Sequence, residues 1–322
     1  MIARLRGALD PYILALLATV GLASLLPARG YAAQGMGLAA NAAIVVLFFL
    51  HGARLSREAI LAGAGNWRLH AAVLATTFGL FPLLGVAIAA LPGLPATAAA
   101  GMQFLTLLPS TVQSSIAFTS IARGNVAAAV CSASFSNLLG IVLTPLLAAL
   151  LMGGHGAGMS WSAAEKIVLQ LLAPFLAGHA LRPWIGGWVA RHRPLVSQVD
   201  RGSILLVVYG AFSAAVVGGL WQKVPLWLIG ALIGLSAVLL AVVLALTWLG
   251  GRAFGLARED AVVLLFCGSK KSLATGVPIA GVLFPAAQVG AVILPVMIFH
   301  QIQLMACAII ARALSRKAPR AA

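Results

Sequence analysis

Two adjacent lysines, Lys270 and Lys271, stand inside a long apolar stretch of the chain. A charged side chain at the centre of a bilayer costs roughly 2.5 to 3.5 kcal/mol on insertion scales, so a pair there indicates a function. We interpret one ammonium group as taking the place of a bound cation, where it pairs with an anionic ligand or changes its protonation. The alternatives are that the amines reach an interface or pair with Asp260, at the start of the same stretch.

Small polar side chains gather near the lysines and at two other places in apolar sequence. Hydroxyl and amide groups of this kind bind either a substrate headgroup or a cation. In membrane bundles the same residue types also join helices by hydrogen bonds, which is the alternative interpretation. The candidate binding residues are Ser110, Thr111, Gln113, Ser114, Ser115, Asn137, Ser269, Lys270, Lys271, Ser272 and Thr275.

The elements that must position these residues are membrane-spanning helices. Of the 322 residues, 62% are hydrophobic and 8% are charged, and the mean hydropathy is +1.06. The apolar runs are about 17 to 25 residues long, which is the length of a helix that crosses a bilayer. The sequence therefore predicts an all-α polytopic membrane protein with about ten transmembrane helices. The predicted spans are 10–27, 36–53, 69–91, 95–121, 125–152, 164–181, 202–221, 226–249, 260–284 and 288–311.

The fourth and ninth predicted spans are both interrupted at an equivalent depth. Pro109 precedes the polar cluster of one span and Gly268 precedes the lysines of the other, and an offset of about 159 residues relates the two halves. Five spans in each half give the halves opposite orientations, so residues 1–158 and 159–322 are predicted to form an inverted repeat. Broken helices at membrane depth persist only inside protein or beside water. We therefore expect the lysines to border a water-filled pocket where helices 4 and 9 break.

The formal net charge of +15 would suggest a nucleic-acid ligand in a soluble chain, but its distribution has a simpler cause. Sixteen of the 21 Lys and Arg residues fall on one side of the predicted spans and three on the other. Basic residues accumulate in cytoplasmic loops, so both termini are predicted to be cytoplasmic. Nucleic acid is therefore not expected as a partner.

Three strings of the sequence resemble the bile acid:sodium symporter family. They are Pro109-Ser-Thr-Val-Gln-Ser-Ser115, Ala122-Arg-Gly-Asn-Val-Ala127 and Gly268-Ser-Lys-Lys-Ser-Leu-Ala-Thr-Gly-Val-Pro278, and the last is similar to the branch that includes the vertebrate member-7-like proteins. The resemblance covers essentially the whole chain. It implies a panel domain of spans 1, 2, 6 and 7, and a core domain of spans 3–5 and 8–10 in which the broken spans 4 and 9 cross. It also implies transport by rocking of the core against the panel.

The sodium site that the resemblance implies is altered in this chain. Two of the family's ion ligands fall on Ser114 and Ser115, which would be the metal ligands if sodium binds. Two hydroxyl ligands fall on Ala129 and Ala133, and a glutamate falls near Phe266, so these side chains offer no oxygen. Sodium coupling is therefore doubtful, and a proton is the other candidate coupling ion.

These observations predict a secondary active transporter that moves an organic anion by alternating access, with a lysine near broken span 9 replacing or altering the sodium site. The alternative is a non-transporting membrane regulator or ion sensor, for example of calcium, on the same fold. No HExxH, GxSxG or paired-aspartate motif is present, so enzyme activity is not expected. We expect no cofactor and no obligate protein partner, and we place the chain in the plasma membrane, the inner membrane of a bacterium. The three cysteines, which are expected to be buried and unpaired, are Cys131, Cys267 and Cys307.

Overall fold

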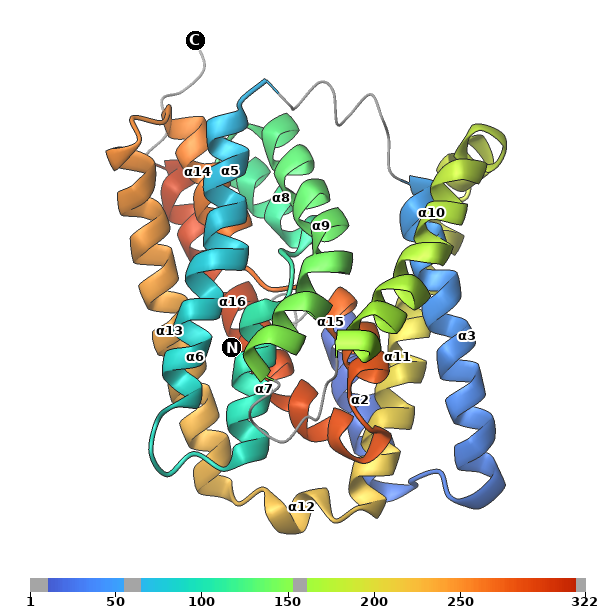
Figure 1. Cartoon of the computed structure of the whole chain (residues 1–322). Coiled ribbons are helices and arrows are strands. Elements are labelled where there is room, and N and C mark those ends of the chain that lie inside the picture. The colour runs from blue at the N-terminus through green and yellow to red at the C-terminus, as the bar shows by residue number, and fades with distance from the viewer. Residues whose placement is uncertain (1–10, 55–64, 153–160, 317–322) are drawn as a thin grey trace.

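The described part of the chain is built from helices. A computed structural model describes residues 11–54, 65–152 and 161–316, and every regular element in these ranges is helical (Figure 1). Within these ranges, seven helices or helical stretches are long and apolar enough to cross a membrane, and a bent pair of helices would make an eighth span. The predicted all-α membrane fold is thus confirmed, whereas the count of ten spans and the inverted repeat stay predictions. The elements are α2 Pro11–Leu25, α3 Gly30–Arg54, α5 Trp67–Ala75, the π-helix η1 Thr76–Leu80, α6 Phe81–Ala89, α7 Ala96–Leu107, α8 Val112–Ile121, α9 Val126–Met152, α10 Trp161–Arg191, α11 Arg193–Val217, α12 Leu220–Lys223, α13 Leu226–Ala253, α14 Arg258–Gly268, α15 Leu273–Leu283 and α16 Ala286–Arg316.

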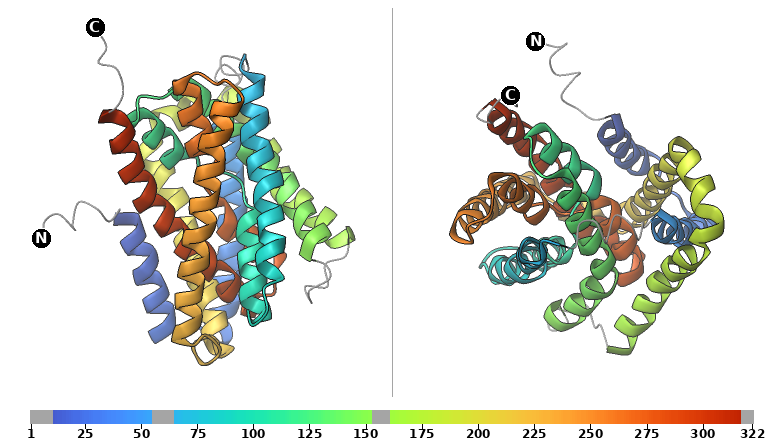
Figure 2. Two further views of the ribbon diagram at one scale, coloured as in Figure 1. Left: turned by 90° about the vertical axis from the view of Figure 1, so that its left-hand side faces the viewer. Right: turned by 90° about the horizontal axis from the view of Figure 1, so that it is seen from above.

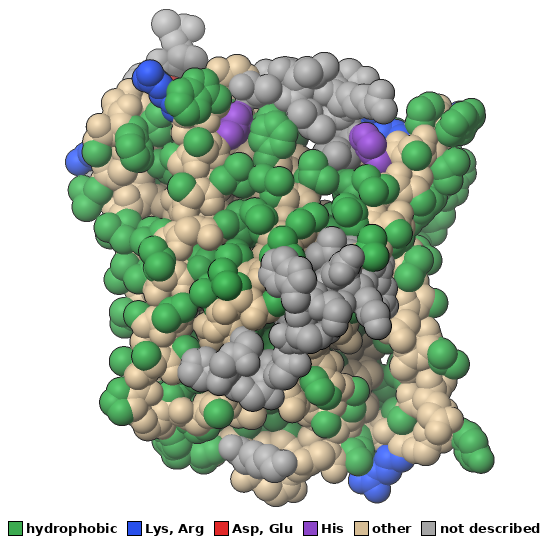
Figure 3. Space-filling view, in the orientation of Figure 1, with side chains coloured by type: hydrophobic (Ala, Val, Ile, Leu, Met, Phe, Trp, Pro, Cys, Tyr) green, Lys and Arg blue, Asp and Glu red, His purple; other side chains and the backbone are tan. Residues whose placement is uncertain are grey.

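The outer surface of the helices is apolar. Large aliphatic side chains such as Leu83, Leu150 and Ile309 are mostly exposed. On the face drawn in Figure 3, hydrophobic side chains cover most of the described surface, and Lys and Arg lie toward its upper and lower edges. An apolar surface of this extent requires a lipid environment. The surface therefore agrees with the membrane location.

The helices pack in two groups. In the first group, α3 contacts α10 and α11, and α11 contacts α2. In the second group, α5 to α9, α13 and α16 pack around α14 and α15. Figures 1 and 2 show the first group beside the second, with α9 and α16 providing contacts between them. Glycines allow α3 and α10 to approach closely, because a Cβ on Gly178 would lie 1.9 Å from the carbonyl oxygen of Phe49. The assignment of panel and core domains stays a prediction.

Two helical stretches of the second group are interrupted near their middles. The α7 helix ends at Leu107, Leu108 is extended, and α8 continues after a bend of 61°. Pro109 explains this interruption, because it has no N–H to donate and disfavours the helical conformation of the residue before it. The second interruption, residues 269–272, separates α14 from α15 within a stretch that is 94% buried. Both interruptions fall where the sequence predicted them.

The largest boundary differences from the structure are in two predicted spans. The predicted span 164–181 is part of α10, which continues to Arg191 with Pro174 and Pro183 inside it. The predicted span 202–221 corresponds to α11, which begins earlier, at Arg193. The predicted spans stop at arginines because a charged residue interrupts an apolar run. Arginine is nevertheless a good helix former, so the helices extend past the apolar run. The predicted repeat boundary at residues 158 and 159 lies outside the described residues.

Candidate functional site

The two interruptions lie against each other and exchange hydrogen bonds. The backbone N–H of Ser272 donates to the carbonyl of Pro109 at 2.9 Å. The hydroxyl of Thr111 donates to the carbonyl of Lys271, also at 2.9 Å. Carbonyl and amide groups left free by each break are thereby satisfied by the other break, as burial requires. The broken stretches therefore cross, and we call residues 108–111 and 269–272 the crossing.

Two serines of the first polar cluster also reinforce the crossing. Ser110 Oγ donates to the carbonyl of Cys267 at 2.6 Å, and Ser115 Oγ donates to the carbonyl of Phe266 at 3.1 Å. These are the last carbonyls of α14, which have no helical donor because the helix ends. The two hydroxyls thus join helices, which is the alternative that the sequence left open for them. Their role as ligands stays a prediction.

Asn137 on α9 connects both halves of the crossing. Its Nδ2 donates to the carbonyl of Ser110 at 2.7 Å, and its Oδ1 accepts from the hydroxyl of Thr275 at 2.9 Å. Ser272 caps α15, because its Oγ accepts from the backbone N–H of Thr275. A half-buried amide with these partners fixes the relative positions of α8, α9 and α15.

The ammonium group of Lys271 is enclosed by main-chain oxygens. Its Nζ donates to the carbonyls of Thr77, Thr106 and Leu108 at 2.8, 2.8 and 2.7 Å. The ring of Phe81 covers it, with Nζ 4.1 Å from the ring centre. The side chain is 1% exposed. All three N–H donors of the ammonium are used, so its charge is fully coordinated inside the protein. We call these three carbonyls the carbonyl cage.

The carbonyl of Thr77 is available because of a local change in helix geometry. In the π-helix η1, the N–H of Phe81 donates to the carbonyl of Thr76, five residues earlier. The residue that would continue this pattern to Thr77 is Pro82, which has no N–H. A single π-turn before a proline therefore turns one backbone carbonyl from the helix to a side-chain donor.

The other two carbonyls of the cage are freed by the break after α7. The N–H of Ser110, four residues after Thr106, donates to the hydroxyl of Ser136 instead of to the helix. Leu108 is extended, so its carbonyl also lies outside the helical pattern. The C-terminal end of a helix carries partial negative charge, which favours a cation at this place. The break thus leaves two carbonyls outside the helical pattern, and both accept from the amine of Lys271.

The backbone of Lys271 is held by Gln303 on α16. The side-chain Oε1 accepts from the N–H of Lys271 at 2.9 Å, and Nε2 donates to its carbonyl at 2.8 Å. Nε2 also lies 2.8 Å from Nδ1 of His300. Gln303 is fully buried. This amide therefore replaces the hydrogen bonds that the backbone of Lys271 loses at the break.

Lys270 has different surroundings from Lys271. Its side chain is fully buried, but Nζ has no hydrogen-bond partner within the described part of the chain. Nζ lies 3.8 Å from the ring centre of Phe118 and 5.5 Å from that of Phe266. Neither lysine pairs with Asp260, whose carboxylate accepts instead from the side chains of Asn66 and Asn125. The alternative interpretation that paired the lysines with Asp260 is therefore wrong.

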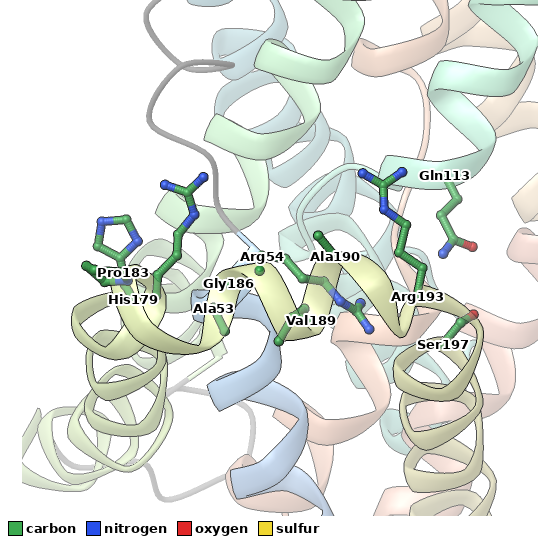
Figure 4. A pocket seen from close by; sticks show the side chains of 12 residues that line it. Ala53, Arg54, Gln113, His179, Pro183, Gly186, Val189, Ala190, Arg193 and Ser197 are labelled. Carbon is green, nitrogen blue, oxygen red and sulfur yellow. The ribbon is translucent and has the colours of Figure 1, made fainter.

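A cavity of about 780 Å³ opens between the two groups of helices, at the arginine-rich ends of α3 and α10. Figure 4 shows Gln113 reaching it from α8, near Arg193 at the start of α11. No carboxylate belongs to its described lining, although Arg54 pairs with Asp200 behind it. This volume is in the range of small-molecule sites. The lining residues are Ala53, Arg54, Gln113, His179, Arg182, Pro183, Gly186, Gly187, Val189, Ala190, Arg193 and Ser197.

Most of the predicted site residues lie in the crossing or on the helices beside it, apart from the cavity. Gln113 is the one that lines the cavity, and the two lysines do not. The expectation of lysines bordering a water-filled pocket is therefore wrong, because the cage and the aromatic rings bury them. Ser114 Oγ is buried without a described partner, and Ser269 Oγ donates to the carbonyl of Leu265 in the last turn of α14. The three cysteines are buried, as expected, and the described residues hold no cluster of His, Cys, Asp or Glu suited to a metal.

Sequence reasoning missed the cage and most of the cavity. The cage consists of backbone oxygens, which carry no residue signature, although Pro82 in an apolar run was a usable signal. The arginines of the cavity were interpreted as loop residues, since they were counted only for orientation. Phe118, which covers Lys270, looked like any apolar residue of a span.

Comparison with known proteins decides the family. A model of the SBF-like CPA transporter family matches residues 10–316. The chain belongs to this family. An uncharacterized protein of Pseudomonas aeruginosa is 56% identical over 319 residues, which cover 97% of this chain and 95% of that protein. The putative symporter YfeH of Escherichia coli is 52% identical over 311 residues, covering 96% and 94%. Sodium/bile acid cotransporter 7 of Danio rerio is 25% identical over 268 residues, covering 82% and 80%.

Membership confirms the resemblance to the bile acid:sodium symporter family and its cotransporter 7 branch. Together with the apolar helices, it identifies the chain as an integral membrane protein of a transporter family. Two of these relatives are named as a putative symporter and a cotransporter.

Proposed function

We propose that this protein is a secondary transporter that moves an organic anion by alternating access, with the ammonium of Lys271 in the place of a coupling cation. The observation that carries the proposal is the carbonyl cage, with three main-chain oxygens 2.7 to 2.8 Å from Nζ. Backbone carbonyls at broken helices are the groups that coordinate cations in many transporters. Here a covalently attached cation fills such a site.

The cavity supports the choice of an anion as substrate. Arg182 and Arg193 line it, and guanidinium groups recognise carboxylates, sulfonates and phosphates by paired hydrogen bonds. Gln113 adds an amide at the second residue of α8, so the cavity reaches the N-terminal end of a half-helix. Such an end carries partial positive charge and favours a bound anion. Because α8 belongs to one group of helices and α10 to the other, relative motion of the groups would open and close the cavity.

The test of this proposal is the thermal stabilisation of the purified protein by anions with and without sodium. Taurocholate, succinate and glucose 6-phosphate serve as probes, each measured in sodium chloride and in choline chloride at equal ionic strength. We expect at least one probe to raise the melting temperature equally in both salts, because Lys271 already occupies the cation site. Stabilisation that requires sodium would contradict the role of Lys271, and no stabilisation by any probe would contradict the proposed substrate class.

The cavity arginines give a second prediction. Replacing Arg193 with Gln should weaken binding of the stabilising anion about tenfold, because one charge-assisted hydrogen bond is worth roughly 1.5 kcal/mol or more. Arg191→Gln is the matched control, since Arg191 bonds to Gly187 of its own helix and is not in the cavity lining. The measurement is the anion concentration that gives half of the maximal stabilisation. Equal values for the two variants would remove Arg193 from the site.

A further inference from the structure

The amine of Lys270 is a buried ionisable group that the crossing does not use. Within the described residues it makes no hydrogen bond, while the neighbouring Lys271 makes three through its amine. An ammonium ion buried without an acceptor is costly, whereas an uncharged amine is tolerated among aromatic rings. The two adjacent lysines therefore differ in their surroundings: three carbonyl oxygens accept from the amine of Lys271, whereas the amine of Lys270 contacts the faces of two aromatic rings.

Few ionisable groups face the amine of Lys270 from the helices packed around it. Cys307 on α16 and Cys267 near the end of α14 interact electrostatically with it. The α8 helix contains no ionisable side chain. On α13, the charged residue is Arg252, which stacks on Trp248. On α16, His300 lies against Gln303. No described carboxylate is in this set, so a proton on Lys270 would bring a net positive charge to the core.

The α8 helix links this amine to the cavity. Gln113 lines the cavity at the start of α8, and Phe118, five residues later on the same short helix, lies over Nζ of Lys270. A change in α8 on anion binding would therefore change the cover of Lys270. In addition, a negative charge in the cavity favours a positive charge on the amine, and the converse holds by reciprocity.

We propose that Lys270 takes up a proton from water when the anion binds and returns it to water when the anion leaves, so that transport is proton–anion symport. This inference rests on the proposed function. The proton binds the lone pair of Nζ and is released from it unchanged, so no other reactant is needed. Lys271 keeps its charge throughout, because its amine stays in the carbonyl cage.

The first test needs no substrate. The melting temperature of the purified full chain is measured from mildly acidic to mildly alkaline pH for the unchanged protein and for Lys270→Met, which keeps the apolar stem. A group that exchanges a proton on unfolding makes stability depend on pH. We expect the melting temperature of the unchanged protein to rise with pH over this range, because an uncharged Lys270 takes up a proton on unfolding. This rise should be lost in Lys270→Met and retained in Cys307→Ser. If the melting temperature of Lys270→Met depends on pH as strongly as that of the unchanged protein, the inference is overturned.

The second test adds taurocholate, succinate and glucose 6-phosphate at one acidic and one alkaline pH. We expect stabilisation by the effective anion to be greater at acidic pH in the unchanged protein and equal at both values in Lys270→Met. The same stabilisation at both values in the unchanged protein would overturn proton coupling and leave the proposed function standing. If no anion stabilises the protein at either pH, the proposed function fails, whereas the first test still decides whether Lys270 exchanges a proton.

Discussion

Replacing Lys271 with Ala is expected to destabilise the protein strongly and to make it dependent on an added small cation. The change removes three hydrogen bonds to buried carbonyls and leaves the carbonyls of Thr77, Thr106 and Leu108 without a donor. Removing one partner of a buried charged interaction lowers the free energy of unfolding by about 3 to 5 kcal/mol. Methylammonium matches the end of the lost side chain, so it should restore part of the loss by binding to the folded state.

The measurement is the melting temperature of Lys271→Ala in methylammonium chloride and in choline chloride at equal ionic strength. Choline is too large for the space left by a lysine side chain, so it controls for salt. Lys270→Ala is the matched variant, because its lost amine has no described hydrogen-bond partner and methylammonium should not rescue it. Equal rescue by both salts, or equal rescue of both variants, would show that the carbonyl cage does not bind a cation.

Replacing Gly178 with Ala is expected to separate α3 from α10. The added Cβ would lie 1.9 Å from the carbonyl oxygen of Phe49, and the reciprocal contact of Gly52 with Phe175 is equally close. Backbone atoms cannot rotate away from such a contact, so the helices must shift. Overpacking of this kind lowers the free energy of unfolding by about 3 kcal/mol.

Gly37→Ala is the control for the glycine prediction, because a Cβ on Gly37, in the partner helix α3, meets no atom within 4 Å. There alanine should be neutral or stabilising by up to about 1 kcal/mol, since it favours the helix. The comparison is made between the melting temperatures of the two variants. If Gly178→Ala has the same melting temperature as the unchanged protein, α3 and α10 do not approach as closely as described.

The sequence was sufficient to predict the two breaks because proline and glycine act locally. Pro109 removes a donor from its helix wherever the chain folds, and Gly268 with four polar residues after it marks the second interruption. The crossing of the two breaks came from the family resemblance, because a single sequence does not reveal which distant segments meet. The exchange of hydrogen bonds between Ser272 and Pro109 is a tertiary property.

The environments of the lysines were beyond sequence reasoning for a different reason. Hydropathy places Lys270 and Lys271 inside a membrane span, but it treats adjacent residues alike. Their difference arises because backbone oxygens surround one amine and aromatic rings surround the other. The serine cluster shows the same limit, since Ser110 and Ser115 bind backbone carbonyls of the partner helix whereas Gln113 lines the cavity. The residue type determines which hydrogen bonds these side chains can donate, and the tertiary structure determines which acceptors they meet.

The central claim is that the ammonium of Lys271 occupies a site built for a small monovalent cation. Its most direct test is anomalous diffraction from crystals of the unchanged protein and of Lys271→Ala, both soaked in thallous acetate. We predict a thallium peak among the carbonyls of Thr77, Thr106 and Leu108 in the variant and none there in the unchanged protein. A peak at the crossing of the unchanged protein, or a folded variant with an empty cage, would contradict the claim.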